Sequence, residues 1–339
     1  MSKAVAIGGF LPLELPLGTG GLLKAWTAGC PFAAFRNARS ALAALISQLS
    51  PPRVWLPAFI CVAVTEGVPF SLRHYYRLNA NLSPDVEDLK QAQPGDMILG
   101  VNYFGYQPDQ AFLNFVTGRP DITFVEDCAH CVLPDEEAWG DWRLFSPRKV
   151  IGVADGGILV AKHSKCPPPQ PTDNPRDADA LWRAPLLRYE DEMQENSSIW
   201  HPDNQAKETA MTVDRTKMTR LTMAALALLE PESIAKKRRR NFAILKENIG
   251  EFLLPQSRST KETPFCFPIR LPPDQRDRVL RHLHADKIFA AVHWTSLPVA
   301  SAEFPEAHLL SQSLISLPCD QRYDADQMRS VATSLRQAL

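Results

Sequence analysis

Residues 122–130 read ITFVEDCAH, a short apolar run that ends in two carboxylates, Glu126 and Asp127. Such a run is typical of a buried strand. Comparable runs recur at 54–56, 97–101 and 157–160, separated by polar or helical stretches. Strands that alternate with helices favour a mostly parallel α/β sheet. Asp127 would then lie at the carboxyl edge of the sheet, where open α/β sheets bind ligands.

A lysine follows this strand within a second motif. Residues 145–157 read FSPRKVIGVADGG, which places Lys149 22 positions after Asp127 and shortly before the Gly156-Gly157 pair. A lysine amine can form a Schiff base with pyridoxal phosphate (PLP) and can then act as the base that moves a substrate proton. A carboxylate beside the pyridine nitrogen favours its protonated form. Together these residues predict a PLP site, with Lys149 as the catalytic residue and Asp127 as the partner of the ring nitrogen.

Further residues complete the predicted cofactor site. We expect His130 beside the PLP ring or its phenolic oxygen, and Ser146, three residues before the lysine, is spaced as a phosphate-binding hydroxyl. Asn37 precedes an alanine-rich stretch typical of a helix, whose first backbone N–H groups suit a phosphate. Arg39 and Ser40 in its first turn would assist. Purely structural roles for these side chains remain open at this point.

The motifs resemble, in order along the chain, those of the DegT/DnrJ/EryC1/StrS family of PLP-dependent sugar aminotransferases. The family motif Glu-Asp-x-Ala-Gln/His is similar to residues 126–130, and Lys-Asn-Leu-x-x-x-Glu-Gly-Gly is similar to residues 149–157. Weaker similarities lie at 37–42, 57–63, 218–219, 238–241, 292–294 and 314–318.

The resemblance carries expectations about fold and reaction. It implies a fold-type I architecture and a homodimer with its sites at the interface. It also implies transfer of an amino group from glutamate, through Lys149, to a nucleotide-linked keto sugar, as in polysaccharide biosynthesis. The amino donor and the keto sugar would be small-molecule partners.

Three positions depart from the family pattern. Cys61 stands where the family usually has an aromatic side chain that stacks on the cofactor ring. Arg39 replaces a phosphate-binding threonine, and Arg215 stands where an asparagine usually reaches the phosphate of the neighbouring subunit. A divergent subgroup is implied.

The sequence predicts two domains. Residues 1–230 would form the large PLP-binding domain, with a long, loop-rich excursion at about 164–207, and residues 231–339 a small α+β domain. Residues 217–249 have a helical pattern, and we interpret the basic run at 236–240 as a solvated face of that helix.

Composition restricts the partners. The chain of 339 residues has a formal net charge of −1 with both signs interspersed, which argues against nucleic-acid binding. No apolar run reaches the roughly 18 residues of a membrane span, and the early residues are interrupted too often by prolines and charges for a secretory signal. Seven cysteines, an odd number spread over the chain, indicate reduced thiols and a cytoplasmic location.

Alternatives to this interpretation remain. Cys128 and Cys131 frame a histidine in a way that can bind zinc, but no second ligand pair follows at a suitable spacing. Another PLP reaction on a sugar is a second alternative. A cofactor-free binding or regulatory protein on the same fold is a third, and the residues at positions 39 and 61 favour it most.

Overall fold

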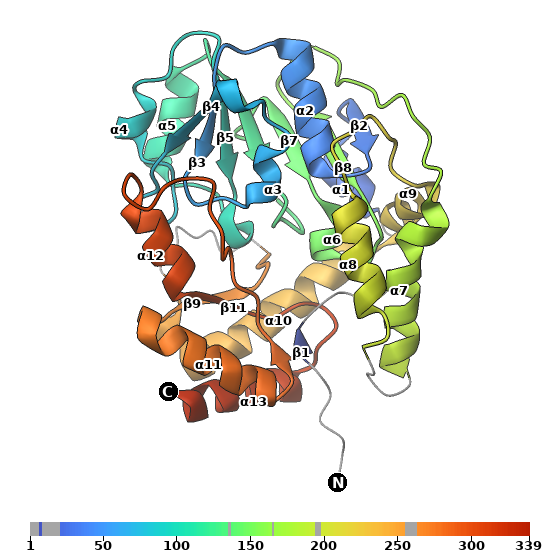
Figure 1. Ribbon diagram of the computed structural model, residues 1–339, viewed down its shortest axis with the longest axis vertical. Helices are drawn as coiled ribbons and strands as arrows, with labels where there is room; N and C mark the ends of the chain where they lie inside the picture. The colour runs from blue at the N-terminus through green and yellow to red at the C-terminus, as the bar shows by residue number, and fades with distance from the viewer. Residues whose placement is uncertain (1–6, 9–20, 135–136, 165, 194–197, 255–262) are drawn as a thin grey trace.

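A seven-stranded sheet forms the centre of the molecule (Figure 1). The computed structural model describes residues 7–8, 21–134, 137–164, 166–193, 198–254 and 263–339. The strand order is β2-β8-β7-β6-β5-β3-β4. The five strands β4, β3, β5, β6 and β7 run parallel to one another, whereas β8 is antiparallel to both β7 and β2. The bounds are β2 (Phe32–Phe35), β3 (Val54–Pro57), β4 (Arg73–Tyr76), β5 (Met97–Val101), β6 (Thr123–Asp127), β7 (Trp142–Phe145) and β8 (Gly157–Ala161). This sheet confirms the predicted α/β class.

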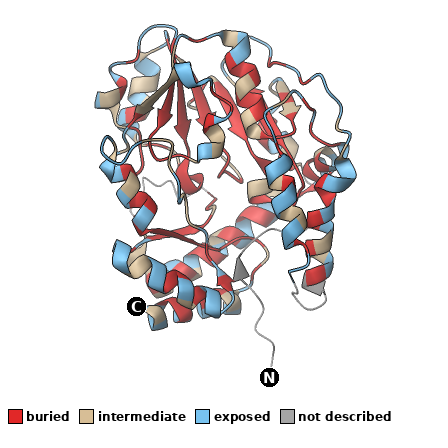
Figure 2. Ribbon diagram, viewed as in Figure 1, coloured by how far each residue is buried: buried red, intermediate tan, exposed pale blue. Residues whose placement is uncertain are grey.

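Helices cover both faces of the sheet. Every residue of β3, β5, β7 and β8 is buried, as expected for strands with a covered face on each side (Figure 2). Leu56, Leu99 and Val125 pack in one apolar cluster with α2, whereas their neighbours Trp55 and Ile98 pack in another with α4 and α5. The helices of this part are α1 (Leu22–Thr27), α2 (Ala38–Leu49), α3 (Val62–Thr65), α4 (Val86–Leu89), α5 (Gln110–Gly118), α6 (Pro147–Val150) and α9 (Arg220–Leu228).

Helix α2 begins where the sequence predicts. The Asn37 side chain accepts a hydrogen bond from the Ser40 N–H at 2.9 Å, which caps the first turn. The Gly-Gly turn before β8 packs directly on this point. Gly156 has a φ of 126°, and a Cβ added at Gly157 would lie 2.1 Å from the carbonyl carbon of Asn37. Glycine is therefore required at position 157, and the start of α2 is held against the start of β8.

The C-terminal part has its own sheet and core. β9 (Phe267–Arg270) pairs antiparallel with β11 (Leu314–Leu317), and α10 (Pro231–Ile249), α11 (Pro273–Ala285) and α13 (Ala325–Ala338) pack around them. Figure 1 shows this layer below the large sheet. Helix α12 (Pro305–Ser313) instead contributes Ala307 and Leu310 to the core around the large sheet. A short pair, β1 (Ile7–Gly8) with β10 (Ile288–Phe289), runs parallel. We propose the boundary between residues 230 and 231, where α10 starts, as the domain division.

The structure corrects two expectations about helices. The excursion at 164–207 is not mainly loop, because α7 (Ala178–Met193) and α8 (His201–Ala210) occupy much of it; residues 165 and 194–197 lie outside the described residues. Pro185 lies inside α7 and made the helical spacing of its apolar residues hard to recognise. Two of those residues, Leu181 and Trp182, are buried. Residues 217–249, which have a helical pattern, form two helices, α9 and α10. The basic run on α10 is only partly solvated, since Arg238 is fully buried.

Within the described part of the chain, none of the helices is both long and apolar enough to cross a membrane.

Candidate active site

Asp127 ends β6 in a buried position. It is 6% exposed, and the Ala129 N–H donates to its carboxylate at 2.8 Å. Among the described residues, this amide is the one hydrogen-bond donor recorded for the carboxylate. Burial raises the pKa of Asp127, and the charge of Lys149 opposes that rise. The buried carboxylate thus calls for a cation.

Lys149 lies on α6, the single helical turn between β7 and β8. Its charge acts on Asp127, His130 and His293. The structure therefore brings together the lysine, carboxylate and histidine that the sequence singled out. Ser146 precedes α6 and is 5% exposed; its hydroxyl has no hydrogen-bond partner among the described residues.

The surroundings of His130 set its protonation. Burial lowers the pKa of His130 well below its ordinary value, with the charges of Lys149 and His293 acting in the same direction. The Phe104 N–H donates to Nδ1 of His130 at 3.4 Å, so Nδ1 carries no proton. A neutral imidazole with an acceptor at Nδ1 carries its proton on Nε2. His130 is therefore a neutral hydrogen-bond donor through Nε2.

Aromatic rings enclose this group. The Phe265 ring stacks on His130 with centroids 4.3 Å apart and planes 7° apart, and the ring of Trp294 lies 6.1 Å away. Nδ1 of His293 lies 2.8 Å from the Ser316 hydroxyl oxygen. Its ring contacts four other rings, and the resulting desolvation lowers the pKa of His293 to about 3, with the charge of Lys149 acting in the same direction.

Two tyrosines lie on the sheet side of Asp127. Burial raises the pKa of both Tyr76 and Tyr103 well above the ordinary value, and the charge of Asp127 adds to it. The Tyr76 hydroxyl donates to the Leu99 carbonyl at 2.8 Å, and the Tyr103 hydroxyl donates to the Phe59 carbonyl. Both protons are thus committed to backbone oxygens. Neither tyrosine hydroxyl therefore donates a hydrogen bond to the Asp127 carboxylate.

The other predicted residues are less clearly part of the group. The guanidinium of Arg39 pairs with Glu66 at 3.0 Å and donates to the Met211 carbonyl. The hydroxyl oxygen of Ser40 accepts the Asp214 N–H at 3.1 Å. Cys61 is partly exposed at the start of α3, and no hydrogen bond or electrostatic interaction recorded for the described residues joins it to Lys149.

A basic cluster lies where α8 meets α6. Arg148 forms an ion pair with Glu208, and Lys207 Nζ lies 3.5 Å from the same carboxylate. Burial lowers the pKa of Lys207 to about 8, with the charge of Glu208 opposing that fall and the charge of Arg148 adding to it. Lys207 is therefore a buried amine near α6, the turn that carries Lys149. The sequence analysis did not identify it.

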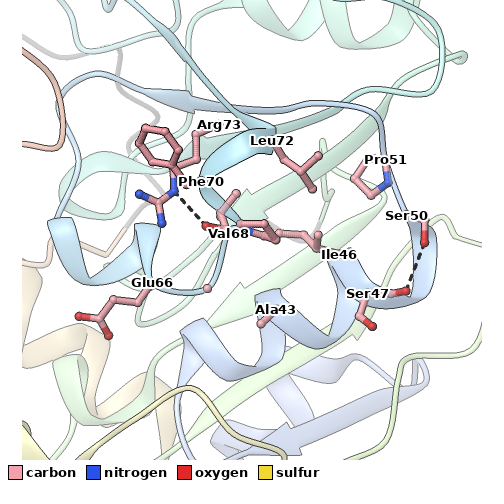
Figure 3. Close-up of a pocket in the computed structure, with 12 residues that line it drawn as sticks. Ala43, Ile46, Ser47, Ser50, Pro51, Glu66, Val68, Phe70, Leu72 and Arg73 are labelled. Atoms are coloured by element: carbon pink, nitrogen blue, oxygen red, sulfur yellow. Dashed lines mark hydrogen bonds between the residues drawn. The ribbon is translucent and has the colours of Figure 1, made fainter.

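A cavity of about 700 Å³ lies elsewhere, between α2 and residues 66–73 (Figure 3). Phe70, 85% exposed, stands at its edge with its ring 5.6 Å from the Arg73 guanidinium. Its lining contains neither Asp127 nor Lys149. The candidate active site is thus defined by the side chains around Lys149.

Sequence reasoning identified part of this arrangement. It predicted Asp127, His130 and Lys149, and it found a weak family similarity at 292–294, which includes His293 and Trp294. It missed Phe104 and Phe265, which come from segments without a motif. No group of metal-binding side chains occurs among the described residues, and both Cys128 and Cys131 are buried.

Comparisons with known proteins agree with the fold. The model of the DegT/DnrJ/EryC1/StrS aminotransferase family matches residues 179–336. Spr1654 of Streptococcus pneumoniae, described as a sugar aminotransferase and solved in its PMP form, superposes with a TM-score of 0.69 at 16% identity over 98% of both chains. The aminotransferase TlmJ of Streptoalloteichus hindustanus gives 0.67 at 16% identity over 98% of both chains.

A third structure points the same way. Helicobacter pylori PseC, an aminotransferase involved in the biosynthesis of pseudoaminic acid, gives a TM-score of 0.66 at 14% identity over 98% of this chain and 99% of its own. No curated protein sequence matches the chain. Residues 179–336 thus match the DegT/DnrJ/EryC1/StrS aminotransferase family, and the chain as a whole has the fold-type I architecture of the PLP-dependent aminotransferases on which it superposes. The family match begins after Lys149, so the role of that residue rests on the geometry described above.

The histidines predict a pH dependence of stability. The pKa of His293 is about 3 in the folded protein against an ordinary value of 6.5. Between these values the unfolded chain binds a proton that the folded chain does not, so the free energy of unfolding falls as the pH falls. His130 acts with the same sign; the raised pKa of Asp127 acts with the opposite sign near its ordinary value of 3.8. Urea unfolding midpoints should therefore decline from about pH 6.5 downwards.

A matched pair of variants tests the origin of this decline. His293→Phe keeps a ring and removes the titrating group, so its midpoint should decline less steeply than that of the wild type. His163→Gln changes an exposed histidine and should leave the slope unchanged. Equal slopes in the wild type and His293→Phe would contradict the assignment.

Proposed function

We propose that this aminotransferase transfers an amino group from glutamate to a nucleotide-linked keto sugar, with Lys149 as the residue that binds PLP covalently. The observation that carries this proposal is the meeting of Asp127, His130 and Lys149 at the carboxyl end of β6. The sugar aminotransferases among the similar structures support the choice of acceptor. A homodimer is part of the proposal, on the strength of the family resemblance.

The side chains present suit PLP. The buried carboxylate of Asp127 has one recorded amide donor and calls for a cation, which a protonated pyridine nitrogen would provide. His130 has a donor at Nε2 for the phenolic oxygen, and the hydroxyl of Ser146 is available for the phosphate. When bound, PLP would supply an aldehyde for the amino group and a ring that withdraws electrons from the substrate carbon.

The residues divide the work. Lys149 Nζ would hold the cofactor and would also be the base that moves the proton at the substrate carbon. Asp127 keeps the ring nitrogen protonated. His130 fixes the ring by its Nε2 proton, because its lowered pKa keeps the imidazole neutral. The aromatic walls exclude water, which strengthens these electrostatic interactions.

The surroundings of Lys149 favour a sugar acceptor. An enzyme that handles α-amino acids alone would be expected to bind the α-carboxylate with an arginine fork. The side chains around His130 are instead rings and imidazoles, among them Phe265, His293 and Trp294. Ring surfaces and hydrogen-bonding nitrogens suit a hydroxylated ring better than a carboxylate.

Replacing Asp127 tests the ring partner. Asp127→Asn keeps size and hydrogen bonding but removes the charge that holds the pyridinium. We expect the variant to bind PLP, with transamination slowed by about tenfold or more, the equivalent of one pKa unit. Asp121→Asn, at a position paired with Arg119 before β6, is the control and should behave like the wild type. Unchanged turnover in Asp127→Asn would exclude this role.

Acceptor preference tests the substrate class. Glutamate or glutamine should convert the bound PLP to its amine form, seen as loss of the yellow absorbance. A nucleotide-linked keto sugar should restore the absorbance faster than a simple 2-keto acid, because the ring-lined site has no assigned carboxylate fork. Stopped-flow absorbance with a panel of both acceptor types measures this. Efficient recovery with 2-keto acids other than the donor's own product, and none with any keto sugar, would place the enzyme in amino-acid metabolism.

A further inference from the structure

Arg238 is a buried charge at the junction of the two parts of the chain. It belongs to α10 and is 1% exposed, although its neighbours Lys236 and Lys237 are exposed. Burying a guanidinium is unfavourable unless its hydrogen bonds are satisfied. The contacts that satisfy it therefore indicate what the residue does.

The guanidinium spans three segments. Nε donates to the Gln321 side chain at 2.7 Å, and one terminal nitrogen donates to the Val150 carbonyl at 2.9 Å. The other terminal nitrogen donates to the Phe265 carbonyl at 2.8 Å. Val150 directly follows Lys149 and ends α6, and the Phe265 ring stacks on His130. One side chain thus holds both the lysine helix and the ring that supports His130.

Gln321 reinforces the same point. Its Nε2 donates to the Val150 carbonyl at 3.1 Å while its Oε1 accepts from Arg238. The Val150 carbonyl consequently receives two donors from the C-terminal part of the chain. Helix α6 is a four-residue turn, which has little stability of its own. The position of Lys149 then depends on these external hydrogen bonds.

We propose that Arg238 and Gln321 are positioning residues for Lys149: by clamping the Val150 carbonyl from the C-terminal part, they hold the amine where it can bond to the cofactor. The inference rests on the proposed role of Lys149. A misplacement of about 1 Å can cost on the order of 100-fold in a reaction that needs aligned groups. Loss of the two donors to Val150 affects the covalent step first, because the proposed ring and phosphate contacts lie on Asp127, His130 and Ser146, and Arg238 reaches His130 only through the backbone of Phe265.

Two cofactor forms separate positioning from general damage. PLP can bond to Lys149, whereas pyridoxamine phosphate carries an amine in place of the aldehyde and binds by its ring and phosphate contacts alone. For Arg238→Met we expect apparent PLP affinity and the rate of covalent attachment to fall by about tenfold or more. Pyridoxamine phosphate affinity should change by less than about threefold. Equal losses for both ligands would overturn the proposal.

A second variant covers the case in which Arg238→Met does not fold. Gln321→Glu keeps the acceptor for Arg238 but replaces the donor to Val150 with a carboxylate oxygen. It should reproduce the selective loss for PLP. Arg239→Met removes the adjacent arginine of α10, which pairs with Glu232 at 3.6 Å, and should leave both affinities unchanged. A Gln321→Glu protein with wild-type attachment of PLP would contradict the clamp.

Hydrogen exchange supplies a readout that needs no cofactor. In the apo protein, amides of residues 148–153 should exchange faster in Gln321→Glu than in the wild type or Arg239→Met. If the wild type does not attach PLP at Lys149, the proposed function fails, and the exchange result alone decides on the clamp. Unchanged exchange in this segment would then reject it.

Discussion

A buried carboxylate with too few partners of its own is the constraint around which the site is built. Asp127 ends a central strand, and burial raises its pKa; among the described residues, one amide and the charge of Lys149 oppose that rise. The tyrosines next to it commit their protons to backbone carbonyls. Leaving a carboxylate in this state costs stability, which the protein recovers when a cation binds. The buried carboxylate of Asp127 therefore favours a positively charged ligand.

Neutral imidazoles follow from the same burial. His130 and His293 both have lowered pKa values, and neither adds positive charge to the surroundings of Lys149. The amine thus faces one carboxylate and two uncharged rings. The hydrogen bond from the Phe104 amide to Nδ1 of His130 and the contact between Nδ1 of His293 and the Ser316 hydroxyl hold the two imidazole rings in place. Electrostatics and stacking act together here, because the rings that exclude water also set the protonation.

Local sequence motifs made the residues at the centre of this site predictable. The residues that reach it from distant parts of the chain could not be predicted in this way. The four predicted strands correspond to β3, β5, β6 and β8, because each is a continuous apolar run. The edge strands β2 and β4 are only partly buried: RHYY in β4 lacks such a run, and FAAF in β2, although apolar, is half alanine, which is depleted in strands. Phe265 reaches His130 from 135 positions further along the chain, a contact that no local pattern encodes. Arg238 was interpreted as solvated for the same reason, since its acceptors lie 27 to 88 positions away.

Trapping the cofactor linkage tests the central claim most directly. Borohydride reduces an imine to a stable amine, so reduction of the protein with PLP followed by peptide mass spectrometry identifies the lysine that holds the cofactor. The account predicts a single label at Lys149. Lys207 is the informative competitor, because its pKa of about 8 also leaves a usable fraction of free amine. A label at Lys207 or another lysine, or none with PLP in excess, would contradict the account.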